Sequence, residues 1–258
     1  MDELMKHSVT NKTFTLYWNY DSPYSRCIKW LLLNKKIAHT DKILSWEKMR
    51  QTPSLALANP KKQVPTLVET DVDTAVEGEK KRRHDSAAFN TTDSLLIALD
   101  YVGVDWHRTL DAKLYRLADA EVEAGIIFLF RANLLKEKFG QSDNSDFMLK
   151  AGIDTYKSSI DLFIDHLLVE VNQGVNDEVN IGAVLLFSTL LAARSMLPET
   201  ELSYRQAELS AFIDLIEADI DYQQMMRECA ANLSEGLSEK MSNNLSETNQ
   251  VSFLWLDA

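Results

Sequence analysis

The pattern of apolar residues changes at Gly103, and this change constrains the fold of the 258-residue chain more than any other feature. Before it, runs of aromatic and β-branched residues alternate with short helical patterns, in the predicted order β-α-β-α-β-β-α. After it, helical patterns cover about 106–138, 146–172, 180–196 and 203–228. The sequence therefore predicts an α/β domain over 13–103 and an all-helical bundle over 105–230. Residues 231–258 predict a polar tail.

The predicted elements of the first domain begin with a run of strand-forming residues, TFTLYW. They are a strand at 13–18, a helix from Pro23 to Leu33, a strand at about 38–44, a weak helix at about 46–58, a strand from Val64 to Val68, a strand at about 87–90 and a helix from Leu95 to Val102. Ser22 before Pro23 favours a helix start, because serine caps free N–H groups and proline suits the first helical position.

The composition argues against several classes of protein. Hydrophobic residues make up 45% and charged residues 26% of the chain, as in a globule with a core. The formal net charge of −12 disfavours nucleic acid as a partner. No stretch approaches the roughly 20 apolar residues that span a bilayer, and MDELMKHSVTNK lacks the apolar core of a secretory signal. With Cys27 and Cys229 as the only cysteines and no metal-ligand spacing of histidines, we expect a cytoplasmic protein without disulfides or metal.

Five segments, taken together, resemble the cytosolic glutathione transferases of the bacterial, serine type. TLYWNYDSPYSRCIKWLLLNKKI is similar to the first strand and helix of that family, with its S-P-x-x-R signature. The others are NPKKQVPTL, TDSLLIALDYV, KLYRLADAEVEAGIIFLF and VNIGAVLLFSTLLAA, in the family's order. The resemblance covers roughly residues 13–230. It implies a thioredoxin-like N-terminal domain, a helical C-terminal domain, glutathione as co-substrate and a homodimer that uses residues 95–138.

Ser22 is the residue to which the resemblance assigns the chemistry. A thiol with a pKa near 8.5 is mostly protonated at neutral pH, and the attacking species is the thiolate. A hydroxyl at a helix N-terminus stabilises that thiolate by a hydrogen bond. Tyr17 and Tyr20 are alternative donors, because some classes of the family use a tyrosine near the end of the first strand. Ser22 as a helix cap alone is the simpler alternative.

The glutathione contacts implied by the resemblance lie at two other places. Pro65 corresponds to the family's cis-proline, which exposes the backbone of Val64 to the cysteinyl residue of glutathione, and Gln63 would line the glycyl side. Asp93 and Ser94 would receive the γ-glutamyl end, through an ion pair with its ammonium and a hydrogen bond to its carboxylate. The alternative for the last two is an ordinary capping pair.

The resemblance also implies an electrophile pocket between the domains, for which we expect Leu114, Tyr115, Ala118 and Glu121 as walls. The chain departs from the family at two places. Asp71–Asp85 is longer than the family's hairpin, and we expect a solvated turn far from the thiol. Asn180 can cap its helix, but Ala183 cannot return the bond as the family's aspartate does.

Three functions follow from these residues. The first is conjugation of glutathione to small hydrophobic electrophiles, as in detoxification, with Ser22 holding the thiolate. The second is a non-catalytic adaptor of the same fold that binds other proteins, because fold alone does not determine function. The third, a glutathione-dependent reductase, is disfavoured because Ser22 and Ser25 stand where that chemistry needs thiols.

Overall fold

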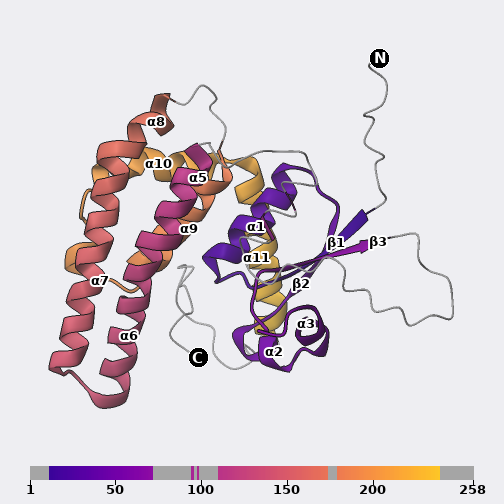
Figure 1. Cartoon of the computed structure of the whole chain (residues 1–258), viewed down its shortest axis with the longest axis horizontal. Coiled ribbons are helices and arrows are strands. Elements are labelled where there is room, and N and C mark those ends of the chain that lie inside the picture. Colours follow the sequence, from indigo (N-terminus) through magenta and orange to yellow (C-terminus); the bar gives the residue numbers. More distant parts are fainter. Residues whose placement is uncertain (1–11, 72–93, 96–97, 99–109, 174–178, 239–258) are drawn as a thin grey trace. The chain divides into compact units, whose positions relative to one another are not determined.

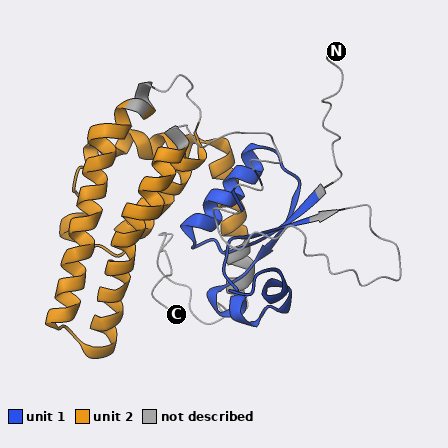
Figure 2. Ribbon diagram, in the orientation of Figure 1, with its two compact units in different colours: residues 1–104, 258 blue, residues 105–257 orange. Residues whose placement is uncertain are grey.

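The computed structural model describes residues 12–71, 94–95, 98, 110–173 and 179–238 (Figure 1). The chain divides into two compact units, residues 1–104 with 258, and residues 105–257 (Figure 2). Within the described residues, the first unit holds a sheet and helices, and the second holds only helices and their connections. The predicted fold class, an α/β domain followed by an all-helical domain, is therefore confirmed. The expected strand at 87–90 and the insertion from residue 72 onward lie outside the described residues.

The sheet of the first unit has the order β2-β1-β3 (Figure 1). The central strand β1 (Lys12–Trp18) runs parallel to β2 (His39–Ile43) and antiparallel to β3 (Thr66–Asp71). The parallel pair is joined by helix α1 (Pro23–Asn34), as a parallel connection requires. The three strands of the first unit that lie in the described part of the chain match those predicted at 13–18, about 38–44 and 64–68, and β3 starts later and extends to Asp71.

The two faces of this sheet bury different side chains. Leu16 pairs with Asp41, whose carboxylate accepts a hydrogen bond from Lys29 of α1 at 2.5 Å, so α1 covers that face. On the other face Tyr17 packs with Leu44 and with helices α2 (Trp46–Gln51) and α3 (Pro53–Ala58). The stretch 46–58 was predicted as one weak helix. It forms two, because Pro53 lacks the N–H that would extend α2.

Helix α1 ends in a Schellman motif with a lysine where glycine is usual. The Ile37 N–H donates to the Leu32 carbonyl at 2.8 Å, and the Lys36 N–H donates to the Leu33 carbonyl at 2.9 Å. Lys36 therefore has a φ of 53° while its side chain is exposed. A left-handed conformation costs a residue with a Cβ about 1–2 kcal/mol.

We expect Lys36→Gly to raise the free energy of unfolding by about 0.5–1 kcal/mol. Glycine removes the cost of the positive φ, and its larger loss of backbone entropy on folding offsets only part of this gain. Lys35→Gly is the matched control, since Lys35 is also exposed but has a φ of −86°. Urea unfolding should show stabilisation for Lys36→Gly and destabilisation for Lys35→Gly. Equal losses in both variants would contradict the prediction.

The second unit begins with two long helical rods that lie side by side (Figure 1). The first comprises α5 (Leu110–Arg116), a π-helical turn (Leu117–Val122) and α6 (Glu123–Phe139). The second comprises α7 (Asp143–Leu162), a π-helical turn (Phe163–Leu167) and α8 (Leu168–Gln173). Between them Gly140 has a φ of 75°, and Ser142 caps α7. In the described residues, the helix expected at 106–138 is present from Leu110 onward, and the helix expected at 146–172 begins at Asp143. Each contains a π-helical turn that the sequence pattern did not reveal.

Helix α9 (Ile181–Arg194) is buried on nearly all sides, as its apolar sequence VLLFSTLLAA predicts. The Asn180 Oδ1 accepts a hydrogen bond from the Ala183 N–H at 2.8 Å, so the predicted cap is confirmed.

The last predicted helix, 203–228, is instead two helices, α10 (Gln206–Ala218) and α11 (Ile220–Ser238). Asp219 separates them, and its carboxylate accepts a hydrogen bond from the Tyr222 N–H at 2.7 Å. Aspartate is a strong N-cap, which explains the break. Helix α11 also continues past residue 231, where we expected the polar tail to start, because ANLSEGLS still contains good helix formers.

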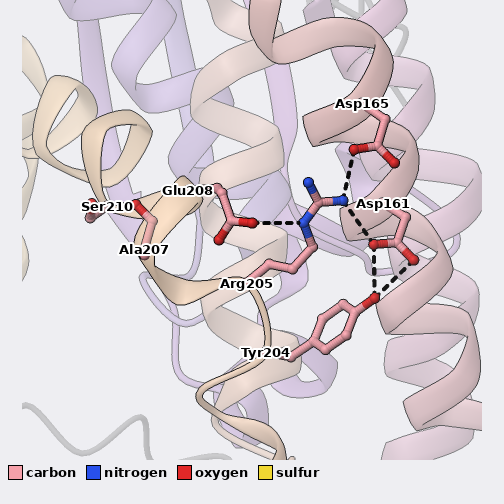
Figure 3. A network of polar contacts seen from close by, with 7 residues as sticks. All are labelled: Asp161, Asp165, Tyr204, Arg205, Ala207, Glu208 and Ser210. Carbon is pink, nitrogen blue, oxygen red and sulfur yellow. Dashed lines mark hydrogen bonds and ion pairs between the residues drawn. The ribbon is translucent and has the colours of Figure 1, made fainter.

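A polar network joins the segment before α10 to the second rod (Figure 3). The Arg205 guanidinium donates to Asp165 at 2.8 Å, to Asp161 at 3.0 Å and to Glu208 at 3.2 Å. The Tyr204 hydroxyl donates to Asp161 at 2.8 Å, and this bond is the main cause that lowers the pKa of Asp161 and raises that of Tyr204. Arg205 has a φ of 47°, so a left-handed backbone aims its side chain at these carboxylates.

Candidate functional site

Three loops meet at one edge of the sheet. Tyr17 near the end of β1 pairs with Thr66 at the start of β3, and Trp18 pairs with Ile43 at the end of β2. The segments 19–22 and 44–46, which follow β1 and β2, and the segment 59–65, which precedes β3, therefore lie at the same edge of the sheet. This edge carries the candidate residue Ser22 and the candidate segment Gln63–Pro65 together.

Ser22 caps helix α1. Its Oγ accepts a hydrogen bond from the Ser25 N–H at 3.2 Å, and its side chain is buried. Its own N–H donates to the Asn19 carbonyl at 3.2 Å, and its carbonyl accepts from the Arg26 N–H at 3.0 Å. The hydroxyl proton of a capping serine stays free to be donated elsewhere, because the cap uses only a lone pair. The position can therefore hold an anion at the helix N-terminus.

Two charged side chains close to Ser22 in the sequence were not predicted as site residues. Asp21 is only 7% exposed, and burial is the largest cause that raises the pKa of its carboxyl, partly offset by the charge of Arg26. The Arg26 Nε donates to the Tyr20 carbonyl at 2.6 Å, so the S-P-x-x-R arginine braces the loop before the helix. Their adjacency to Ser22 in the sequence was the available signal.

The raised pKa of Asp21 has a defined effect on stability. The folded state holds this proton more tightly than the unfolded chain, so the contribution is fully present below about pH 3.8 and is lost as the pH rises through the folded-state pKa. We expect Asp21→Asn to be stabilised relative to the parent at pH 7, and less so at pH 4. Urea unfolding at both pH values measures this, and a pH-independent difference for Asp21→Asn would refute it.

The alternative tyrosines have other contacts. Tyr17 is 5% exposed within the cluster against α2 and α3, and its hydroxyl accepts a hydrogen bond from the Lys42 Nζ at 3.1 Å. Tyr20 is half-buried, and its carbonyl receives the Arg26 bond. Tyr17 thus packs on the sheet face opposite α1, while Ser22 stands at the start of that helix.

The segment Gln63–Pro65 precedes β3. The Val64–Pro65 peptide bond is cis, as the resemblance implied. Gln63 is exposed, Val64 is half-buried and Pro65 is buried. The Asn59 Nδ2 donates to the Gln63 carbonyl at 3.3 Å and to the Thr66 Oγ1 at 2.9 Å, which fixes the segment from within.

The remaining predicted glutathione contacts are only partly described. Ser94 is buried and helical, together with Leu95 and Ala98, whereas Asp93 lies outside the described residues. Their predicted roles therefore stay predictions.

The four residues expected to line an electrophile pocket do not share one face. Leu114, Tyr115 and Ala118 are buried, but Glu121 is exposed and Val122 is buried in its place. Leu114 and Glu121 are seven residues apart, so they lie on the same face only in a helix with 3.6 residues per turn. The π-helical turn between α5 and α6 widens that repeat and turns Glu121 outward.

Basic residues in β2, in α2 and in the turn before β3, which flank these loops in the sequence, are exposed. They are Lys42, Lys48, Arg50, Lys61 and Lys62. The Lys62 Nζ donates to the Arg50 carbonyl at 3.3 Å, which ties the turn before β3 to α2. Residues 12–71 contain ten lysines and arginines against five aspartates and glutamates, although the whole chain has a net charge of −12. The net charge of the whole chain gives no indication of this local excess of basic residues.

Within the described ranges, no cluster of His, Cys, Asp and Glu side chains has the arrangement of a metal site. In the same ranges, no helix has the length and apolar character needed to cross a membrane.

The elements described above form the glutathione-transferase fold, a thioredoxin-like domain followed by an all-helical domain. A glutathione S-transferase from the Antarctic clam Laternula elliptica has 20% sequence identity and a TM-score of 0.59, over 83% of this chain and 91% of that chain.

Two further solved structures of this fold contain glutathione. The glutathione transferase URE2P6 from Phanerochaete chrysosporium, in complex with oxidised glutathione, has 13% identity and a TM-score of 0.62, over 85% and 97%. A maleylacetoacetate isomerase from Anaeromyxobacter dehalogenans, with glutathione in its active site, has 15% identity and a TM-score of 0.56, over 84% and 95%. No protein-family model matches the chain, and no curated protein matches its sequence.

Proposed function

We propose that the chain is a serine-type glutathione transferase that joins glutathione to small hydrophobic electrophiles. The observation that carries the proposal is the position of Ser22, whose hydroxyl caps α1 at the sheet edge where the segment Gln63–Pro65 also lies. Solved proteins of the same fold hold glutathione, which supports the choice of ligand.

In this proposal the tripeptide binds along that edge. The backbone of Val64 pairs with its cysteinyl residue, and Gln63 lines its glycyl end. Asp93 and Ser94 take the γ-glutamyl end. Exposed basic residues at the edge favour the anionic peptide.

In this proposal, one hydrogen bond to the sulfur stabilises the reactive thiolate. The thiol loses its proton to solvent, and the Ser22 hydroxyl donates to the resulting sulfur anion, which the N-terminus of α1 also stabilises. The sulfur forms a bond to an electrophilic carbon, and the leaving group departs with the electron pair of the broken bond. The buried Asp21 carboxyl opposes the anion when it is ionised, whereas Arg26 favours it.

Calorimetric titration with glutathione tests the proposal most directly, followed by absorbance of the bound thiolate as a function of pH. We expect saturable binding and a thiol pKa below the free value of about 8.5. S-methylglutathione, which cannot ionise at sulfur, is the control and should bind without the absorbance change. If glutathione does not bind, the glutathione-transferase activity is excluded, and the non-catalytic adaptor is the candidate function that remains.

We also propose a homodimer. Ile127 and Phe130 of α6, within the predicted interface 95–138, are 44% and 48% exposed in the single chain. Apolar side chains exposed on one helix favour an isologous contact with a second copy. Light scattering at micromolar concentration should give twice the 29.4 kDa of the chain, and a monomer mass would contradict the proposal.

A further inference from the structure

Asn19 is the first residue of the loop between β1 and α1. Its side chain is 1% exposed. The Oδ1 accepts a hydrogen bond from the Asp21 N–H at 2.7 Å, and the Nδ2 donates to the Leu44 carbonyl at 2.7 Å. Its backbone carbonyl accepts from the Ser22 N–H at 3.2 Å, and its N–H donates to the Ser25 Oγ at 3.3 Å. One residue thus bonds to three residues at the start of α1 and to one at the end of β2.

These bonds fix the position of the helix start in two directions. The Asp21 and Ser22 bonds set the turn by which the chain enters α1. The Leu44 bond ties this turn to the residue before Ser45, which caps α2. An amide side chain offers an acceptor and a donor on two separate atoms, so Asn19 can bond to both partners at the same time. Ser22 contributes to the turn only its backbone groups and the bond to the Ser25 N–H.

We infer that Asn19 is a positioning residue that places the Ser22 hydroxyl and the first N–H groups of α1 against the sulfur of glutathione. This inference rests on the proposed function. A hydroxyl stabilises a thiolate only within hydrogen-bond distance, so a small shift of the turn weakens the bond without removing the serine. Asn19 acts through Ser22 and does not touch the ligand.

Asn59 provides a matched comparison. It is also a fully buried asparagine, and its amide also braces a loop at this edge through the Gln63 carbonyl and the Thr66 Oγ1. Its loop carries Val64 and not Ser22. Loss of the Asn59 amide therefore disturbs how glutathione binds, whereas loss of the Asn19 amide disturbs how its sulfur is ionised.

The experiment compares Asn19→Ala with Asn59→Ala in the full chain. Both remove a buried, bonded amide, so both should lower the melting temperature. We expect Asn19→Ala to move the pH at which bound glutathione ionises upward by about one unit, to reduce turnover roughly tenfold and to leave affinity within about twofold. We expect Asn59→Ala to weaken affinity and to leave the ionisation pH of the bound thiol unchanged.

Asn19→Ser is a second, milder variant. Serine can still accept from the N–H two residues ahead, but it cannot reach the Leu44 carbonyl. It should fold and show a smaller upward shift of the same ionisation pH. The inference is overturned if both folded Asn19 variants keep the parental ionisation pH, or if Asn59→Ala shifts it equally. Failure of the proposed function looks different, since the parent itself would then show no lowered thiol pKa.

Discussion

Ser22→Ala should lower the turnover of glutathione conjugation by about 10- to 100-fold while glutathione affinity changes little. The lost bond from the hydroxyl to the thiolate is charge-assisted and contributes about 1.5–3 kcal/mol. That energy corresponds to about one to two decades in rate. The bond forms with the anion, so it favours ionisation more than binding of the neutral thiol. Steady-state kinetics with an aromatic halide, together with calorimetry, measures both quantities.

The control for this variant is Ser142→Ala in the second unit. Ser142 caps α7 as Ser22 caps α1, with its Oγ accepting from the Ser145 N–H at 3.3 Å. Each substitution removes a helix cap and should cost about 1 kcal/mol of stability. Only Ser22→Ala should lower turnover. If turnover survives in Ser22→Ala, the serine is a cap alone and Tyr17 and Tyr20 become the donors to test.

Gly152→Ala should destabilise the protein by up to about 2 kcal/mol, although alanine is the better helix former. A Cβ on Gly152 of α7 would lie 2.7 Å from the Cγ of Leu129 and 3.0 Å from its backbone N. Leu129 is fully buried, so α6 and α7 must separate or the side chain must leave its rotamer, at about 1–3 kcal/mol. The helix propensity gained, about 1 kcal/mol, does not offset the larger part of that cost.

Gly125→Ala on α6 is the matched control. A Cβ there meets its nearest neighbour, the Gly152 carbonyl oxygen, at 3.4 Å, which is ordinary contact, so this variant should be stabilised by about 0.5–1 kcal/mol. Thermal unfolding should therefore shift in opposite directions for the two glycines. In a Leu129→Ala background the cost of Gly152→Ala should largely disappear. A persistent cost there would show that the close contact is not its cause.

The sequence predicted the features that depend on short-range chemistry. Ser22 before Pro23 marked the start of α1, and the apolar run after Asn180 marked the buried helix α9. Each signal works because a cap or a buried face needs particular residue types at fixed positions. The break at Asp219 had a comparable signal, an aspartate that can cap a helix, which the longer helical pattern obscured.

Other features have no short-range signal. The π-helical turn beside which Glu121 is exposed and Val122 is buried has no marker in the sequence, and the role of Glu121 in a pocket stays a prediction. The role of Asn19 depends on a partner 25 residues away, and in the sequence it looks like an ordinary turn residue. The contacts of Arg205 likewise involve carboxylates about 40 residues earlier in the sequence.

The excess of basic residues around the site loops bears on how fast an anionic ligand arrives. A ligand associates faster when the local electrostatic field of nearby charged residues attracts it, even if the net charge of the whole protein repels it. Because Lys48, Arg50, Lys61 and Lys62 are exposed, added salt screens them over a Debye length of about 8 Å at physiological ionic strength. The encounter rate with an anionic peptide should therefore fall with ionic strength, while the dissociation rate stays nearly constant.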